Sequence, residues 1–151
     1  MIFLLDTDTF ILLLRGSALR SPRTAREQEV ADSAKRIRER VCKEAGDGRQ
    51  IGLSAISLAE LEYGLHAGGR YTEKSPAMQR VLLPFEKFPF EPIHCIHHYG
   101  RIRAALEQAG TTIGPLDLLI AAHALALNAT LVSHNTREFG RVPDLSMEDW
   151  A

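Results

Sequence analysis

Short apolar segments alternate with longer amphipathic segments along this chain, and this alternation is what most constrains its fold. Ile2–Leu5 contains no polar side chain, which is typical of a central strand buried on both faces of a parallel sheet. Further strands are predicted at Ile51–Leu53, Pro92–Ile96, Thr130–Ser133 and Leu145–Met147. Strand–helix units of this kind predict an α/β fold, a three-layer α/β/α sandwich around a central parallel sheet.

Helical patterns fill the intervals between these strands. The first helix is predicted at Thr7–Arg15 and is followed by a polar loop over Gly16–Ala25. A long amphipathic helix is predicted at Thr24–Ala45 from an apolar stripe of Val30, Ala34, Ile37, Val41 and Ala45. Later helices are predicted at Ser57–Leu65, Ala77–Phe88, His98–Ala109 and Pro115–Leu127.

Size and composition point to one soluble domain spanning residues 1–151. A chain of 151 residues buries about 68–70% of its unfolded surface. The formal net charge of -1 argues against tight non-specific binding of nucleic acid, so local basic groups and metal ions would have to hold such a substrate. The two cysteines form no disulfide framework, and neither a signal peptide nor a membrane span is evident. We therefore expect a cytoplasmic protein without membrane attachment.

Four polar side chains follow a strand or begin a helix, namely Asp6, Glu60, Asp117 and Asn135. The C-terminal ends of parallel strands and the N-termini of the following helices share one sheet edge, so these side chains are expected to converge there. Two carboxylates about 4 Å apart repel by about 4 kcal/mol at an effective dielectric of about 20. A hard cation such as Mg²⁺ removes that cost, and the sequence therefore predicts a metal site.

Each of the three acids also has a local explanation. Asp6 fits a helix N-cap, and Asp117 after Pro115 fits the favourable first turn of a helix. Ser57 and Glu60 fit a capping box, in which Glu60 only ties back to its own helix.

Six segments in order extend this pattern: FLLDTD at 3–8, SLAELEYG at 57–64, YGRIRA at 99–104, IGPLDLLIAAHA at 113–124, LVSHNTREF at 131–139 and EDW at 148–150. Together they resemble the PIN-domain ribonucleases, and in particular the VapC-type toxins of type II toxin–antitoxin modules. The resemblance covers nearly the whole chain except residues 16–50. There the long helix departs from the shorter linker of the family.

The resemblance implies a Mg²⁺- or Mn²⁺-dependent endoribonuclease with a PIN-like fold, which cleaves phosphodiester bonds and is neutralised by a cognate, VapB-like antitoxin. It implies that Asp6, Glu60, Asp117 and Asn135 are the catalytic residues. Asp6 and Asp117 would hold the metal ion, with Glu60 binding directly or through water. The family also implies an RNA substrate and a homodimer.

Two positions depart from the family pattern and leave the number of metal ions open. Asn135 stands where many PIN domains place a fourth acid, and an amide can ligate but adds no charge. Asp8 stands where these toxins often carry Asn. Its carboxylate either restores the missing charge at the metal site or simply caps the helix.

Basic and imidazole groups add candidate RNA contacts. Arg15, Arg20, Arg23 and Arg26 form a segment without an acidic residue, which is either a solvated loop or an arm that contacts phosphates. His134 beside Asn135 either lines the RNA groove or lies on a surface loop. For the cluster His94–His98 we expect a buried Cys95 and solvent-facing histidines rather than zinc, because the spacing fits no common zinc module.

Two other functions remain as alternatives. A haloacid-dehalogenase-type phosphatase would use Asp6 as nucleophile and Asp8 as acid/base, but it needs a lysine late in the chain, and the last one here is Lys87. A degenerate PIN-like module that binds RNA without cleaving it is favoured only by the amide at Asn135.

Overall fold

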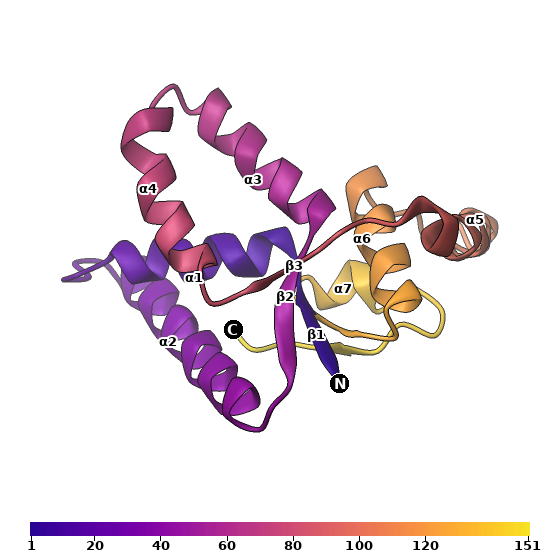
Figure 1. Ribbon diagram of the computed structural model, residues 1–151, viewed down its shortest axis with the longest axis horizontal. Coiled ribbons are helices and arrows are strands. Elements are labelled where there is room, and N and C mark those ends of the chain that lie inside the picture. The colour runs from indigo at the N-terminus through magenta and orange to yellow at the C-terminus, as the bar shows by residue number, and fades with distance from the viewer.

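The computed structural model describes all 151 residues and contains one five-stranded parallel sheet in the order β3-β2-β1-β4-β5. Its strands are β1 (Ile2–Leu5), β2 (Gln50–Ser54), β3 (Glu86–Phe88), β4 (Thr130–Val132) and β5 (Met147–Glu148). The helices are α1 (Thr7–Ala18), α2 (Ala25–Gly46), α3 (Ala55–Ala67), α4 (Tyr71–Leu82), α5 (Pro92–Gln108), α6 (Pro115–Ala126) and α7 (Thr136–Phe139). The sheet lies between two groups of helices, α1 to α4 and α5 to α7 (Figure 1). This is the predicted three-layer α/β/α sandwich.

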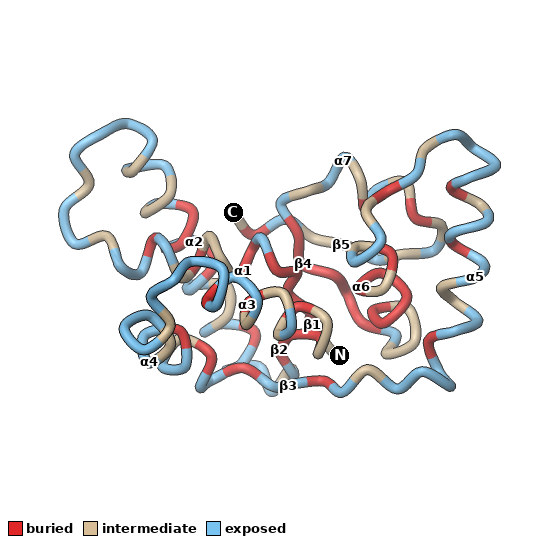
Figure 2. Tube along the Cα trace, turned by 90° about the horizontal axis from the view of Figure 1, so that it is seen from above, coloured by how far each residue is buried: buried red, intermediate tan, exposed pale blue.

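Each face of the sheet carries its own hydrophobic core. Phe3 and Leu5 of β1 pack with α1 to α4, whereas Leu4 between them packs with α5 to α7. Side chains alternate across a strand, so a strand without polar residues serves both cores at once. The buried parts of the chain accordingly gather around the sheet, and the exposed parts lie mainly toward the periphery, on outer helix surfaces and connecting loops (Figure 2).

The helix α2 packs closely on α1 through a glycine contact. A Cβ added at Gly16 would lie 2.2 Å from the Cβ of Ala34 and 2.7 Å from the carbonyl oxygen of Val30. Of the predicted apolar stripe, Ala34 and Ile37 are buried and Val30 and Val41 are partly buried. Ala45 was predicted inward and is exposed, because the neighbouring Glu44 takes the inward position and meets two arginines there.

Several element boundaries differ from the sequence prediction. The last strand, predicted at Leu145–Met147, is β5 at Met147–Glu148. The helix α1 continues through residues 16–18 into the predicted loop, because Gly16 packs against α2. The helix predicted at Ala77–Phe88 begins at Tyr71 and ends at Leu82, and its last residues instead form β3, which pairs with β2. The strand predicted at Pro92–Ile96 is the first part of α5, in which the fixed φ of Pro92 suits the first helical turn.

The strand order places a topological switch point at β1. This strand pairs with β2 on one side and with β4 on the other, so that Leu5 lies opposite both Leu53 and Val132. Asp6 after β1, Ser54 at the end of β2 and Ser133 after β4 therefore emerge side by side at one sheet edge, where open α/β sheets place their sites. None of the helices is long and apolar enough to cross a membrane.

Candidate active site

Asp6 is held by both of its carboxylate oxygens. As the N-cap of α1 it accepts a hydrogen bond from the Thr9 backbone N–H at 2.7 Å through Oδ1. Its Oδ2 accepts a hydrogen bond from the buried Ser133 hydroxyl, which belongs to the end of β4. Burial raises the pKa of Asp6, and the bonds from Ser133 and Thr9 offset part of this rise. The N-cap explanation thus accounts for Oδ1 of Asp6. Its Oδ2, through the bond from Ser133, links the end of β1 to the end of β4.

Glu60 lies in α3 and faces the start of α1. The capping box predicted for it is wrong, because Ser54 rather than Ser57 is the N-cap of α3, accepting from the Ile56 N–H at 3.1 Å. Glu60 instead accepts a hydrogen bond of 2.6 Å from the Thr7 hydroxyl at Oε1. Because Thr7 follows Asp6 directly, this bond holds a second carboxylate beside the first.

Asp117 lies in the first turn of α6 and is surrounded by other acids. Burial raises the pKa of this carboxyl to about 6, and further contributions come from negative charges on Glu138, Asp6, Glu60 and Asp8. The structure contains no ion pair between any of these carboxylates and a lysine, arginine or histidine. Five acids therefore raise the negative potential of one sheet edge without compensation from a cationic side chain.

The other candidates are less tightly held. Asn135 precedes α7 without a side-chain cap bond, and its backbone N–H donates to the Ser133 hydroxyl at 2.9 Å. Asp8 is exposed in the first turn of α1, near enough to raise the pKa of Asp6 and Asp117. His134 is exposed, with its Nδ1 3.0 Å from Oδ2 of Asp149.

The four arginines of the basic segment are exposed and lie away from the acids. Arg15 is in the last turn of α1 and Arg26 is in the first turn of α2, so only Arg20 and Arg23 occupy the connecting loop. The 12 residues of α1 span about 18 Å between Asp6 and this segment. In α5, Cys95 is buried and His94 and His97 are exposed, as expected, but His98 is partly buried and so departs from the prediction of solvent-facing histidines.

Sequence reasoning missed three residues of this site: Thr7, Ser133 and Glu138. Among the charges that raise the pKa of Asp117, that of Glu138 contributes most. Its signal in the sequence was an acid in the first turn of a helix, the same position that singled out Asp117. Thr7 and Ser133 carried no signal of their own, since small hydroxyl residues are common at strand ends and helix starts.

The donor set fits a hard divalent cation. All the converging groups offer oxygen ligands, which Mg²⁺ and Mn²⁺ prefer. As the side chains stand, no three His, Cys, Asp or Glu groups are drawn together closely enough to hold an ion. The carboxylates therefore interact electrostatically, but they lie too far apart to form a coordination shell. A cation among the carboxylates would offset their mutual repulsion.

Ser133→Ala should destabilise the folded protein by about 1–3 kcal/mol, because Asp6 Oδ2 and the Asn135 N–H each lose a partner in a buried place. Ser57→Ala is the matched control: both serines are fully buried, but the Ser57 hydroxyl has no hydrogen-bond partner. Urea unfolding should show that Ser57→Ala is neutral or stabilising. Equal losses for both variants would contradict a role for Ser133 in holding Asp6.

Comparison with known proteins identifies the family. The PIN domain family matches residues 3–145. The ribonuclease VapC1 of Haemophilus influenzae strain R2866 is 34% identical over 156 aligned positions, covering 99% of this chain and 98% of that protein. The tRNA(fMet)-specific endonuclease VapC of Salmonella typhimurium is 34% identical over 98% of this chain and 97% of its own.

Solved structures agree with this assignment. The crystal structure of VapBC2 from Rickettsia felis, bound to a DNA fragment from their promoter, contains a similar chain with a TM-score of 0.81. The two are 34% identical, and the similarity covers 100% of both chains. The chain therefore belongs to the PIN domain family, among its VapC-type members.

Proposed function

We propose that this protein is a Mg²⁺- or Mn²⁺-dependent endoribonuclease, the toxin of a toxin–antitoxin pair. The observation that carries the proposal is the group of uncompensated carboxylates around Asp117 at the switch point of the sheet. An RNA phosphate is itself an anion, so these acids would repel it unless a cation lay between them. Relatives named ribonuclease or endonuclease that match almost the full chain support the same activity.

In this proposal Asp6 and Asp117 hold the metal ion, and Glu60 binds it directly or through water. When bound, the ion would polarise a phosphate oxygen and lower the pKa of a bound water molecule, so that a hydroxide nucleophile would be available at neutral pH. Ser133 and Thr9 hold the Asp6 carboxylate, and Thr7 holds Glu60, so two of the acids are oriented in advance.

The remaining candidates act at the rim of the site. Asn135 carries no charge, so it can approach a phosphate without repelling it, and Asp8 adds a further oxygen ligand. Attack on phosphorus in line with the departing 3′ oxygen would leave a 5′-phosphate and a 3′-hydroxyl. Arg15, Arg20, Arg23, Arg26 and His134 are proposed to contact the RNA beyond the cleaved bond.

The proposed partner is a VapB-like antitoxin. Structures similar to this chain are VapBC complexes from Rickettsia felis, nontypeable Haemophilus influenzae and Salmonella typhimurium, with identities of 34%, 32% and 29%. We also propose a homodimer as the form that binds the antitoxin. Size-exclusion chromatography with light scattering, with and without the antitoxin, would measure both assemblies.

Removal of metal provides the direct test. Purified protein incubated with end-labelled single-stranded RNA and Mg²⁺ should yield fragments with 5′-phosphate ends, EDTA should stop cleavage, and added Mn²⁺ should restore it. Cleavage that persists in EDTA would contradict the metal-dependent mechanism. RNA binding without cleavage in either metal would favour the non-catalytic module, and hydrolysis of a phosphate monoester would favour the phosphatase.

A further inference from the structure

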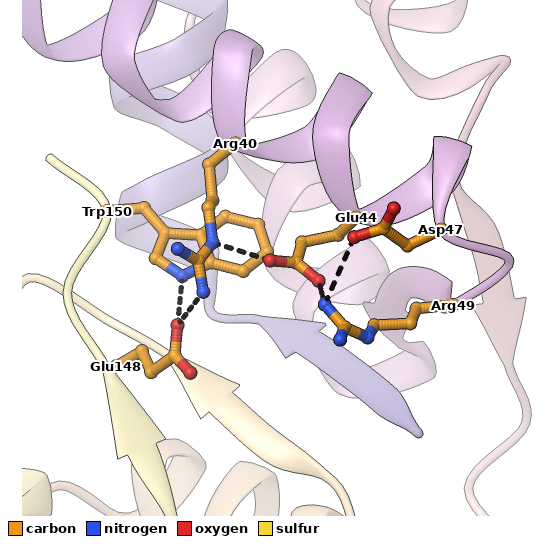
Figure 3. A network of polar contacts seen from close by, with 6 residues as sticks. All are labelled: Arg40, Glu44, Asp47, Arg49, Glu148 and Trp150. Atoms are coloured by element: carbon orange, nitrogen blue, oxygen red, sulfur yellow. Dashed lines mark hydrogen bonds and ion pairs between the residues drawn. The ribbon is translucent and has the colours of Figure 1, made fainter.

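We propose that Arg40 of α2 is a positioning residue for the active site, which it reaches through Glu148, the β5 backbone and Ser133. The catalytic part of this inference rests on the proposed function. The structural part rests on a network of ion pairs that joins α2 to the C-terminal segment (Figure 3).

The network is centred on Glu44, whose side chain is 1% exposed. Arg40 Nε lies 2.8 Å from Glu44 Oε1, and Arg49 Nη1 pairs with the other carboxylate oxygen. Asp47 is a weaker, outer partner of Arg49, with 3.7 Å between Oδ2 and Nη1. A buried carboxylate needs such partners, since an unpaired charge there would cost several kcal/mol.

Arg40 links Glu44 to the C-terminal segment. Its Nη2 lies 3.0 Å from Oε2 of Glu148, and the same oxygen accepts a bond of 2.7 Å from the Trp150 indole N–H. The Arg40 guanidinium also lies over the Trp150 ring, 5.6 Å from its centroid, and that ring packs on Phe3 of β1 at 5.0 Å. Arg40 therefore holds both ends of a short segment against the sheet (Figure 3).

This segment needs external support because β5 is only two residues long. It pairs with β4 at two positions, Leu131 with Met147 and Val132 with Glu148. So short an edge strand has few ladder hydrogen bonds of its own. Its position accordingly depends on side-chain contacts, and the contacts of Glu148 all lead to Arg40 and Trp150.

The backbone of Glu148 in turn supports the active site. Its carbonyl oxygen accepts the Ser133 N–H at 3.0 Å, and the Ser133 hydroxyl donates to Asp6. The next residue, Asp149, contacts His134 at 3.0 Å. A shift of β5 would therefore move Ser133 and His134 together, and with them the carboxylate of Asp6.

Arginine suits this position because its planar fork meets two carboxylates at once. Nε lies 2.8 Å from a Glu44 oxygen as an ion pair without hydrogen-bond alignment, and Nη2 donates a hydrogen bond to Glu148. A lysine has a single ammonium group and could hold one of the two carboxylates well, but not both in this geometry. Arg40→Lys should therefore be intermediate between the native protein and a variant without charge.

Arg49 provides a matched control. Arg40 and Arg49 pair with the same buried Glu44 and are exposed to almost the same degree, 37% and 36%, but only Arg40 reaches Glu148. Both Arg40→Met and Arg49→Met should thus lower Tm, Arg40→Met by more because it also loses the contacts with Glu148 and Trp150. Only Arg40→Met should speed hydrogen exchange at the Ser133 amide, by about tenfold, and lower kcat for RNA cleavage by about tenfold with KM unchanged. Arg40→Lys should recover part of both.

Hydrogen exchange measured by NMR tests the positioning role without any assumption about activity. If Arg40→Met and Arg49→Met show the same Ser133 exchange, or the same kcat relative to the native protein, the positioning role is overturned and the network is only structural. If the native protein cleaves no RNA, the proposed function fails. In that case a Ser133 exchange rate that rises in Arg40→Met alone still supports the mechanical link.

Discussion

Replacing Asp117 by asparagine is expected to abolish RNA cleavage, with kcat lower by about 10³-fold or more, while making the metal-free protein more stable at neutral pH. The two effects have one cause. The Asp117 carboxylate is half-buried among four other acids, which is unfavourable for the fold and favourable for a cation. An amide of the same shape removes the repulsion and, with it, the negative charge proposed to bind the metal ion.

The pH dependence follows from the raised pKa of Asp117. An acid whose pKa is higher in the folded than in the unfolded state stabilises the fold below its unfolded pKa, and this contribution is lost as the pH rises through the folded value. For Asp117 the loss extends from about pH 3.8 to about pH 6. A rise of this size corresponds to about 3 kcal/mol in a fully buried site. Solvent screening reduces it to about 1–2 kcal/mol here.

Chemical denaturation of metal-free protein between pH 4 and pH 8 would measure this difference, and labelled RNA would measure cleavage. Asp144→Asn is the control, because Asp144 is exposed and lies at the surface in an ion pair with Arg101. Its backbone φ of 62° suits asparagine as well as aspartate. The control should cleave RNA at the native rate. Full activity in Asp117→Asn would remove the basis of the proposed metal site.

Gly16→Ala is expected to destabilise the fold by about 1–3 kcal/mol. The new methyl group would lie 2.2 Å from the Cβ of Ala34 and 2.7 Å from the Val30 carbonyl oxygen, so α1 and α2 would have to move apart. Neither neighbour is the end of a flexible side chain that could turn away. Because Asp6 is the N-cap of α1, this separation would also disturb the candidate active site.

Gly64→Ala is the matched control for this substitution. Both glycines lie inside helices, but a Cβ at Gly64 would meet nothing within 4 Å. Alanine is better than glycine in a helix interior, so this variant should gain about 0.5–1 kcal/mol. Urea titration of both variants would therefore show shifts in opposite directions. Equal stability of the two alanine variants would mean that α1 and α2 are not closely packed at Gly16.

The layers of the fold and the edge that gathers the acids were predictable from the sequence. The run Ile2–Leu5 has no polar side chain, and this alone requires a strand covered on both faces. Once the strands were parallel, their C-terminal ends and the N-termini of the neighbouring helices had to share one edge, and this edge carries Asp6, after β1, and Asp117, in the first turn of α6. These predictions rest on periodicity and chain direction, which local sequence determines.

Details that depend on tertiary packing were not predictable. The residues of β3 were predicted to end a helix, because Leu82, Phe85 and Phe88 recur at helical spacing. In the structure they form a strand instead, because they pair with β2. The spacing of Ser57 and Glu60 fits the sequence pattern of a capping box, but the N-cap of the helix is Ser54. The bond from Thr7 to Glu60 joins residues 53 positions apart, which no local pattern reports.

The bond between Ser133 and Asp6 joins residues 127 positions apart, and both strands beside β1 come from later in the chain. During translation, β1 therefore leaves the ribosome long before β4, Ser133 and β5 exist to complete its surroundings. Parallel pairing over such separations is slow, because loop closure precedes the contacts that stabilise it. A nascent chain would thus carry Asp6 and Glu60 for most of its synthesis without an assembled site, which delays any cleavage until the final residues of the sheet have been added.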